Sequence, residues 1–295
     1  MGGDFYALGR VEWRMRGEAP SQHDFDHVYT HQLYAGFGHK QFGELTYGNM
    51  VTITDEVKQS DLANTYSLTD GLLETSARRV TQYVYNGDYG SNKVKFGAYY
   101  GGSSKRSIKN VDLKNNRKNT WGTGLIFNHE IDSIQNVTVA AGFTRQISEN
   151  ANKTAYYSNA YALGLAYNFV HTTYGLDLAH KDTKNKGGAG NKVKNNEVTA
   201  VIRQGLNEDW NVYAMYSYKT EKTLPVGSAY SKSTDRQFLV GTEYYVFKQG
   251  SVKVKPFIEW QATRTKYENT FDKDSGKQLD RSRDFKTVIG LRAYW

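Results

Sequence analysis

The beginning of the chain alternates between apolar and polar side chains with a period of two. Phe5, Val11 and Trp13 fall on one series of positions, whereas Arg10 and Glu12 fall on the other. Because a β-strand points successive side chains to opposite faces, this pattern predicts a strand with one apolar face and one water-facing face. A helix with the same sequence would mix both kinds of residue on every face.

The same alternation returns in many later segments, among them 137–144, 160–169 and 252–261. In each segment one series of positions is apolar or aromatic, and the other is polar or small. A soluble sandwich would have to bury the second series, including Lys255 and Glu259, at a prohibitive cost in free energy. The pattern therefore favours a membrane barrel whose apolar face meets lipid and whose polar face lines a lumen.

Counting these segments predicts an all-β protein, a transmembrane antiparallel β-barrel of about fourteen strands, each near the ~9–11 residues that a tilted strand needs to cross a bilayer. The strands are expected at 4–17, 26–38, 42–49, 77–86, 92–100, 119–130, 135–146, 157–169, 171–181, 195–204, 210–219, 235–246, 252–267 and 283–295. Short turns are expected at 38–41, 87–91, 131–134, near 170, at 205–209 and at 248–251, and long loops at 18–25, 50–76, 101–118, 147–156, 182–195, 220–234 and 268–282. Short periplasmic turns with long outer loops are typical of outer-membrane barrels, so residues 1–295 are expected to form a single barrel.

Composition supports a barrel wall and argues against a conventional soluble core. Hydrophobic residues make up 38% of the 295 residues, below the ~45–50% that is usual for globular domains. The chain has 23 Tyr, a residue suited to a surface that is apolar at one end and wet at the other. No apolar run approaches the ~18 residues of a membrane helix, which leaves a closed barrel as the membrane route. The absence of Cys suits passage through an oxidising periplasm.

The net charge of +8 does not indicate a nucleic-acid partner, because Lys and Arg are scattered through loops and alternate strand positions instead of forming one stripe. Anionic solutes or lipopolysaccharide phosphates fit this charge better. The basic segments 105–117 and 181–194 are expected to be solvated loop tips, with contact to lipopolysaccharide phosphate as the alternative. The start of the sequence shows no signal peptide, so it is either a mature chain with a new Met or part of a longer gene product.

Three segments carry a resemblance to a known family: DFYALGRVEW at 4–13, YAGFGHKQFGELTYG at 34–48 and VIGLRAYW at 288–295. In this order the chain resembles the general porins of Gram-negative outer membranes, most closely the Pasteurellaceae-type major outer-membrane porins. The resemblance implies an outer-membrane porin that forms a passive, water-filled diffusion channel for small hydrophilic solutes and ions. A homotrimer is the candidate assembly that it implies.

The chain also departs from the family pattern. Barrels of the family usually have about sixteen strands, and their first hairpin should precede Gly2. Closure is therefore expected between the strand at Asp4 and the strand that ends at Trp295, unless the sequence is part of a longer one. Both ends fall on the short-turn side, which allows such closure. Asn49 stands where the family has an arginine, and the Pro-Glu-Phe-Gly-Gly stretch of the family's inner loop is missing.

By resemblance, the segment 50–76 corresponds to the family's third loop, which folds into the barrel and narrows the pore. The expected acidic side of this constriction consists of Glu12, Asp55, Glu56, Asp61, Asp70 and Glu74, and the expected basic side of Arg10, Arg14, Arg16 and Arg79. Opposite charges across a water-filled gap would create a transverse field that orients dipolar solutes. Inward strand positions carry slightly more cations than acids, which predicts weak anion preference. A solvated outer loop, with lumen residues charged only because they are wet, is the alternative.

Two further sequence features concern assembly and metal binding. The last strand presents an alternating apolar face with Ile289 and Leu291 and ends at the aromatic Trp295, which looks like the signal read by the barrel assembly machinery. A histidine-rich stretch contains His23, Asp26, His27 and His31. Residues four apart on a strand lie ~13 Å apart, too far for one ion bound at ~2 Å, so neither a metal nor another cofactor is expected.

Three classes of function stay open: a channel, an outer-membrane barrel with a hydrolase or adhesin role, and a soluble β-rich binding protein. A hydrolase needs a Ser/His/Asp set at the outer rim, and the sequence shows neither that spacing nor a Gly-x-Ser-x-Gly turn, a zinc pair or a phosphate loop. No enzymatic activity is therefore expected. A soluble protein would stay monodisperse without detergent, whereas an apolar band ~25 Å tall demands detergent.

Overall fold

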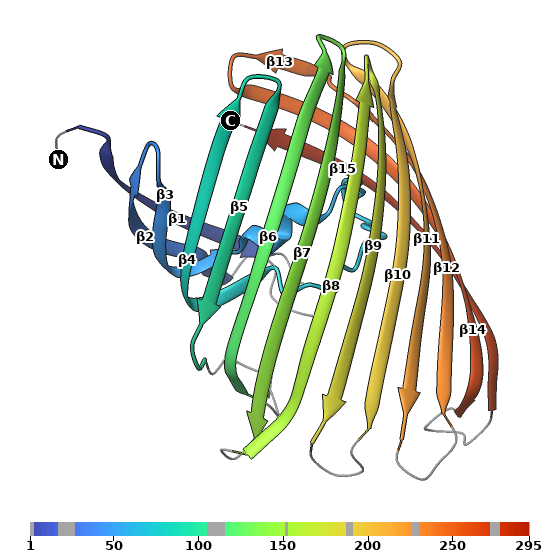
Figure 1. Cartoon of the computed structure of the whole chain (residues 1–295). Helices are drawn as coiled ribbons and strands as arrows, with labels where there is room; N and C mark the ends of the chain where they lie inside the picture. Colours follow the sequence, from blue (N-terminus) through green and yellow to red (C-terminus); the bar gives the residue numbers. More distant parts are fainter. Residues whose placement is uncertain are drawn as a thin grey trace.

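The chain forms one antiparallel sheet in which each long strand pairs with the next along the sequence (Figure 1). The structure is a computed structural model that describes residues 3–16, 27–104, 116–150, 153–186, 191–225, 230–271 and 278–294. Its elements are β1 (Phe5–Arg16), β2 (His27–His39), β3 (Gly43–Val51), the 3₁₀ helix η1 (Ile53–Val57), β4 (Ser76–Tyr89), β5 (Asn92–Gly101), β6 (Asn116–Asp132), β7 (Gln135–Asn150), β8 (Lys153–Phe169), β9 (Thr172–Asn185), β10 (Lys192–Gly205), β11 (Trp210–Leu224), β12 (Ser231–Tyr244), β13 (Phe247–Gln249), β14 (Val252–Phe271) and β15 (Gln278–Tyr294). Among these residues no helix is long and apolar enough to cross a membrane.

The strands expected from the alternation are confirmed, and the structure adds one short strand. β13 has 3 residues, pairs with β14 alone and lies next to the turn expected at 248–251. Several strands also run further toward the long loops than expected; β8, for example, begins at Lys153. Backbone N–H and C=O groups need hydrogen-bond partners whatever side chains they carry. The hydrogen-bonded ladder can therefore extend beyond the part of the strand in which apolar and polar side chains alternate.

The two faces of the sheet are those that the alternation assigned. On β7, Val139 is 38% exposed on the outer face, whereas Ala140 and Thr144 are buried on the concave face. On β14, Trp260 is exposed on the outside and Glu259 is fully buried on the inside. The wall is thus apolar outside and polar inside, the reverse of a soluble protein, and this is the arrangement that a bilayer requires.

A pair of arginine substitutions on β7 tests this assignment. We expect Val139→Arg to abolish refolding into detergent micelles and Thr138→Arg to be tolerated, because a lipid-facing Arg near the midplane costs ~2–4 kcal/mol while an inward Arg reaches lumen water. Thr138 lies on the inner face, where its hydroxyl accepts a hydrogen bond from Asn128 Nδ2 at 2.9 Å. Heat-modifiable migration in gel electrophoresis would measure the folded fraction. Equal folded fractions for the two variants would show that the faces are assigned wrongly.

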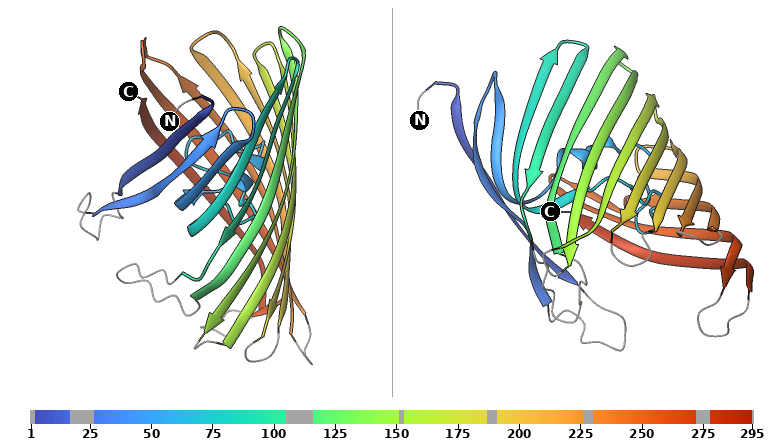
Figure 2. Two further views of the ribbon diagram at one scale, coloured as in Figure 1. Left: turned by 60° about the vertical axis from the view of Figure 1, so that its left-hand side comes forward. Right: turned by 60° about the horizontal axis from the view of Figure 1, so that its bottom comes forward.

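The sheet curls into a barrel wall whose two end strands do not meet. Figures 1 and 2 show β1 and β15 on either side of an open seam. Over the described strands, β1 pairs only with β2, and β15 pairs only with β14. The direct closure expected between these two strands is therefore not present. The alternation that predicted each strand fixes which faces point outward, and it carries no information about which edges pair.

Candidate functional site

Between β3 and β4 the chain crosses the concave side of the sheet instead of turning back directly. This crossing segment, residues 52–75, lies inside the curl of the wall in both views of Figure 2. Four of its large apolar side chains, Ile53, Val57, Leu68 and Leu73, are at most 6% exposed. They pack into three clusters with inward-facing wall residues, which include Val80 of β4, Ala140 of β7 and Met215 of β11. Burial of such a side chain is worth about 1.5–3 kcal/mol, so these contacts hold the crossing segment to the wall.

The wall is made of very small residues where the crossing segment lies closest to it. Gly97, Gly124 and Gly142 are directly opposite one another on β5, β6 and β7. A Cβ atom at Gly142 would come within 2.8 Å of both Leu73 Cδ1 and Val57 Cγ2, and one at Gly164 of β8 within 2.0 Å of the Val57 carbonyl oxygen. Glycine in a strand often marks such a close approach of another backbone.

Buried carboxylates on β9 and β10 accept hydrogen bonds from the backbone of the crossing segment. Asp177 accepts from Gln59 N at 2.8 Å, from Ser60 N at 2.8 Å and from Ser60 Oγ at 2.5 Å. Glu197 accepts from Asp70 N at 2.9 Å. The crossing segment has little regular structure of its own, so its N–H groups need partners outside it, and charged acceptors form stronger hydrogen bonds than neutral ones.

A second pair of buried carboxylates holds the crossing segment at its far end. Glu259 of β14 accepts hydrogen bonds from the backbone N–H groups of Asn64, Thr65 and Tyr66 at 2.5, 3.0 and 2.9 Å. Glu243 of β12 accepts from Asn64 Nδ2 at 2.8 Å and also pairs with Arg203 and Lys255. The Asn64 carbonyl oxygen in turn accepts from the guanidinium group of Arg292. Asn64 is thus fixed on its N–H, its carbonyl and its side chain.

Two glutamines fix the beginning of the crossing segment. Gln82 of β4 accepts a hydrogen bond from Ile53 N at 2.8 Å, and Gln32 of β2 accepts from Val51 N at 3.2 Å. Gln32 also donates to Glu12 of β1 at 2.6 Å, so this expected acidic residue lies beside the base of the crossing segment. The crossing segment therefore bridges the wall from β2 and β4 to β14.

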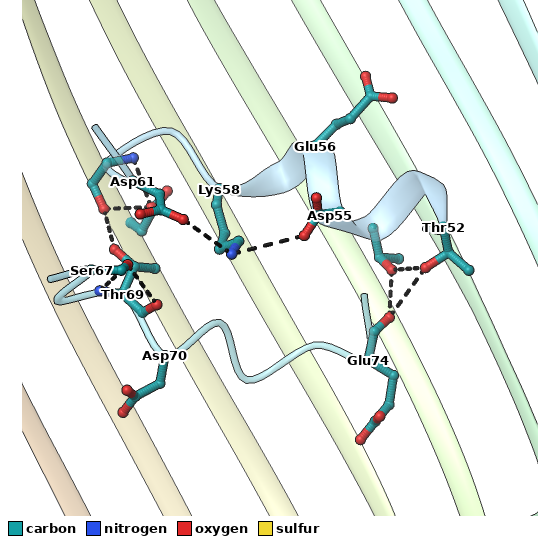
Figure 3. A network of polar contacts seen from close by, with 12 residues as sticks. Thr52, Asp55, Glu56, Lys58, Asp61, Ser67, Thr69, Asp70 and Glu74 are labelled. Atoms are coloured by element: carbon teal, nitrogen blue, oxygen red, sulfur yellow. Dashed lines mark hydrogen bonds and ion pairs between the residues drawn. The ribbon is translucent and has the colours of Figure 1, made fainter. Parts of the chain in front are cut away.

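The two limbs of the crossing segment are also tied to each other (Figure 3). The Thr54 hydroxyl donates to the Glu74 carbonyl oxygen at 2.7 Å, and the hydroxyls of Ser60 and Thr69 are 2.8 Å apart. Lys58 Nζ lies 3.8 Å from Asp55 and 3.4 Å from Asp61, between the two carboxylates. These contacts make a compact hairpin-like unit that can keep its shape in the lumen.

The remaining expected acids of the crossing segment pair with lysines on the wall. Glu56 lies 2.5 Å from Lys95 of β5, Glu74 lies 3.1 Å from Lys181 of β9, and Asp70 lies 2.7 Å from Lys219 of β11. The acids of 52–75 therefore meet the strands over which the segment passes. They alternate with lysines instead of forming one acidic surface.

The expected basic side lies elsewhere. Arg10 of β1 pairs with Glu12 at 2.9 Å, and Arg79 lies at a bulge of β4, where its N–H donates to Asn49 Oδ1 at 3.3 Å. Arg14 and Arg16 belong to β1, but their side chains lie outside the described part of the chain. Within that part, no acid of the crossing segment forms an ion pair with Arg10 or Arg79. The reason is geometric, because the acids of the crossing segment lie over β5 to β11, where they pair with lysines.

The expected assembly signal lies on the outer face of the last strand. Ile289 and Leu291 are 78% and 66% exposed on the outer face of β15, and Trp295 lies outside the described residues. His23 and Asp26 are also outside them, and over the described ranges no group of three or more His, Asp or Glu side chains could hold a metal ion.

An apolar outer wall, a polar lumen and an ion-paired segment across that lumen define a transmembrane β-barrel of the channel-forming class. The sequence profile of the Gram-negative porins matches residues 1–256, and the chain belongs to this family. It is an integral protein of the bacterial outer membrane and forms a passive diffusion channel for small hydrophilic solutes and ions.

Individual relatives are distant in sequence and close in fold. The major outer membrane protein of Pasteurella multocida is 22% identical over 272 residues, which cover 91% of this chain and 68% of that protein. The solved structure of Vibrio cholerae OmpT is 16% identical, covers 100% of this chain and 86% of its own, and has a TM-score of 0.67. Salmonella typhi OmpF in complex with daunomycin has a TM-score of 0.64 at 14% identity, with 99% of this chain and 87% of that chain covered.

Proposed function

We propose that the segment 50–76 sets the width of this channel and that solutes pass beside it. The observation that carries the proposal is the division of the crossing segment into two sides. Four of its large apolar side chains are buried against the wall, whereas Asp55 and Asp70 keep 41% and 60% of their side chains exposed. A segment held in this way narrows the lumen and presents charged groups to whatever passes.

The experiment that tests the channel is planar-bilayer recording of the refolded protein in salt. Stable open steps, together with uptake of small sugars by proteoliposomes, support the proposed solute path. Silence across several refolding conditions, with protein that is folded by heat-modifiable migration, would refute it. We further propose that the channel has no enzymatic role; hydrolysis of ester or peptide substrates by the purified protein would contradict this.

We propose weak anion preference for this channel, because most charges around the crossing segment are paired. Replacing Arg10 and Arg14 together by Ala is expected to move the reversal potential in a salt gradient toward cation preference. The reason is that the Arg10 guanidinium group lies 2.9 Å from Glu12. Without it, the negative charge of the Glu12 carboxylate faces the lumen with less compensation.

The matched control replaces Lys40 and Lys248 by Ala. These lysines pair with Asp4 and Asp209 at the short-turn end, and their loss should leave the reversal potential near its original value. A strong cation preference of the unaltered protein would contradict the proposal, and so would a reversal potential that does not move in the double Arg variant.

We also propose three partners outside the solute path: two further copies of the chain in a homotrimer, lipopolysaccharide, and the barrel assembly machinery. A trimeric form of Vibrio cholerae OmpT, with a TM-score of 0.66 at 15% identity, supports the first of these. The mass of the detergent-solubilised protein by light scattering tests it, and a monomer would count against it. The exposed outer face at Ile289 and Leu291 supports the last, and truncation of the final residues should reduce insertion in cells.

A further inference from the structure

The outer face of the sheet carries a row of arginines close to its long-loop end. Arg236 of β12 is directly opposite Arg264 of β14, and Arg264 is directly opposite Arg283 of β15. These three strands run side by side toward the lower right of Figure 1. Directly opposite residues on one face have Cβ atoms ~4.5–5.5 Å apart, so the three guanidinium groups share a small area of surface.

Aromatic side chains place this arginine row at the edge of the apolar band. The next residues on the same face toward the middle of the wall are Phe238 on β12 and Phe285 on β15, and Trp260 of β14 lies one step further, beyond Ala262. The ring of Trp260 lies 6.4 Å from that of Phe238 and 6.2 Å from that of Phe285. Aromatic girdles mark the two membrane interfaces of outer-membrane barrels. Two residues along a strand advance ~6.6–6.8 Å, so the arginine row lies just beyond the rings, at the level of lipid headgroups.

The surface around the arginine row has an excess of positive charge. Beyond the row, Lys266 is directly opposite Arg281, and Glu268 lies 3.7 Å from Lys232 and 3.9 Å from Lys266. In the described part of the chain, the guanidinium groups of the arginine row form no ion pair or hydrogen bond. Like charges directly opposite each other on a sheet are destabilising, so the bare row weakens the wall unless an anion lies among its members.

We propose that the arginine row binds a phosphate group of lipopolysaccharide in the outer leaflet. Guanidinium groups bind phosphate through paired N–H donors, and three of them at headgroup depth suit a charged group on a membrane-embedded lipid. The acyl chains of that lipid would lie along the exposed surface of Phe238, Trp260 and Phe285. The site depends on the orientation of the barrel, with its long loops outside, and not on the solute path inside it.

The test uses purified lipid A as the probe and the complete chain refolded in a nonionic detergent. We expect lipid A to bind the unaltered protein and to bind R236Q/R264Q/R283Q about tenfold or more weakly, since each hydrogen bond to a charged group is worth more than one tenfold step in affinity. The matched control, K40Q/K93Q/K248Q, removes the same charge at the opposite rim and should bind as the unaltered protein does. Lipid A with its phosphates removed should bind the unaltered protein as weakly as lipid A binds the arginine variant.

A second measurement, the unfolding temperature, separates a specific site from general attraction between opposite charges. Without lipid, the arginine variant should unfold at a higher temperature than the unaltered protein, because its like-charge contacts are gone. Added lipid A should raise the unfolding temperature of the unaltered protein and leave that of the arginine variant unchanged. The single variant R264Q, with intermediate affinity expected, serves if the triple variant does not refold.

Four results would overturn the proposal, three of which concern lipid A. They are equal lipid A affinity in the unaltered protein and the arginine variant, an equal loss in the control variant, and equal binding of lipid A with and without phosphates. Binding of inorganic phosphate as strong as that of lipid A would also overturn it, because it would show an anion site without a lipid.

Discussion

Deleting residues 55–70 is expected to raise the single-channel conductance severalfold and to admit larger sugars. The two limbs are tied where the deletion would join them, since Thr54 donates to the Glu74 carbonyl oxygen at 2.7 Å, so a short connection can replace the missing residues. The wall keeps its hydrogen-bonded ladder, and the acids exposed by the deletion, such as Asp177, gain lumen water in place of backbone N–H donors. Planar-bilayer recording and liposome swelling with sugars of increasing size measure the two effects.

A charge-only variant separates size from electrostatics in this experiment. Asp55→Asn with Asp70→Asn keeps the crossing segment in place and removes two of its exposed carboxylates. We expect it to change the reversal potential and to leave the sugar cut-off as it was. Unchanged conductance and unchanged cut-off in the deletion variant would show that the crossing segment does not narrow the path.

The strands could be predicted from the sequence because alternation is a local property. Val139 and Thr138 are consecutive in a strand, so their side chains point to opposite faces, Val139 toward the outside and Thr138 toward the lumen. No distant residue is needed to place them. The extra residues of β8 and the seam between β1 and β15 could not be predicted in this way. Strand ends in water are set by backbone pairing, and the edges of the sheet are set by contacts between residues far apart in sequence.

The candidate site was predicted less completely. Alternation cannot distinguish an inward acid that faces water from an inward acid that is covered by another segment of the chain. Asp177 and Glu259 occupy lumen positions, but they are covered by the backbone of the crossing segment, while Glu12 is only partly covered. The path of that segment has no periodicity, so the pairing of Glu56 with Lys95 was not predictable. A usable signal was present in the inward glycines of adjacent strands, among them Gly142, which leave room for a second layer of backbone.

Replacing Glu259 by Gln is expected to loosen the far end of the crossing segment while the barrel still folds. The Glu259 carboxylate is fully buried and accepts from three backbone N–H groups and from the Tyr213 hydroxyl at 2.7 Å. A glutamine offers a single acceptor oxygen and turns two N–H donors toward groups that are themselves donors. Each donor left unpaired costs roughly 1–3 kcal/mol.

A single reporter thiol measures this loosening directly, because the chain has no Cys. Ala63 is partly buried beside the cluster around Leu68, so Ala63→Cys changes little by itself. In the Glu259→Gln background we expect its labelling by a water-soluble thiol reagent to accelerate about tenfold or more, since ~1.4 kcal/mol of lost anchoring corresponds to a factor of ten. Single-channel records should show added open-channel noise.

Glu130→Gln is the matched control, because Glu130 pairs with Lys93 at 2.5 Å, away from the crossing segment. If labelling is equally fast in the Glu259→Gln and Glu130→Gln backgrounds, the buried carboxylate of β14 does not hold the segment, and its position depends on the apolar contacts of Leu68 and Val57 alone.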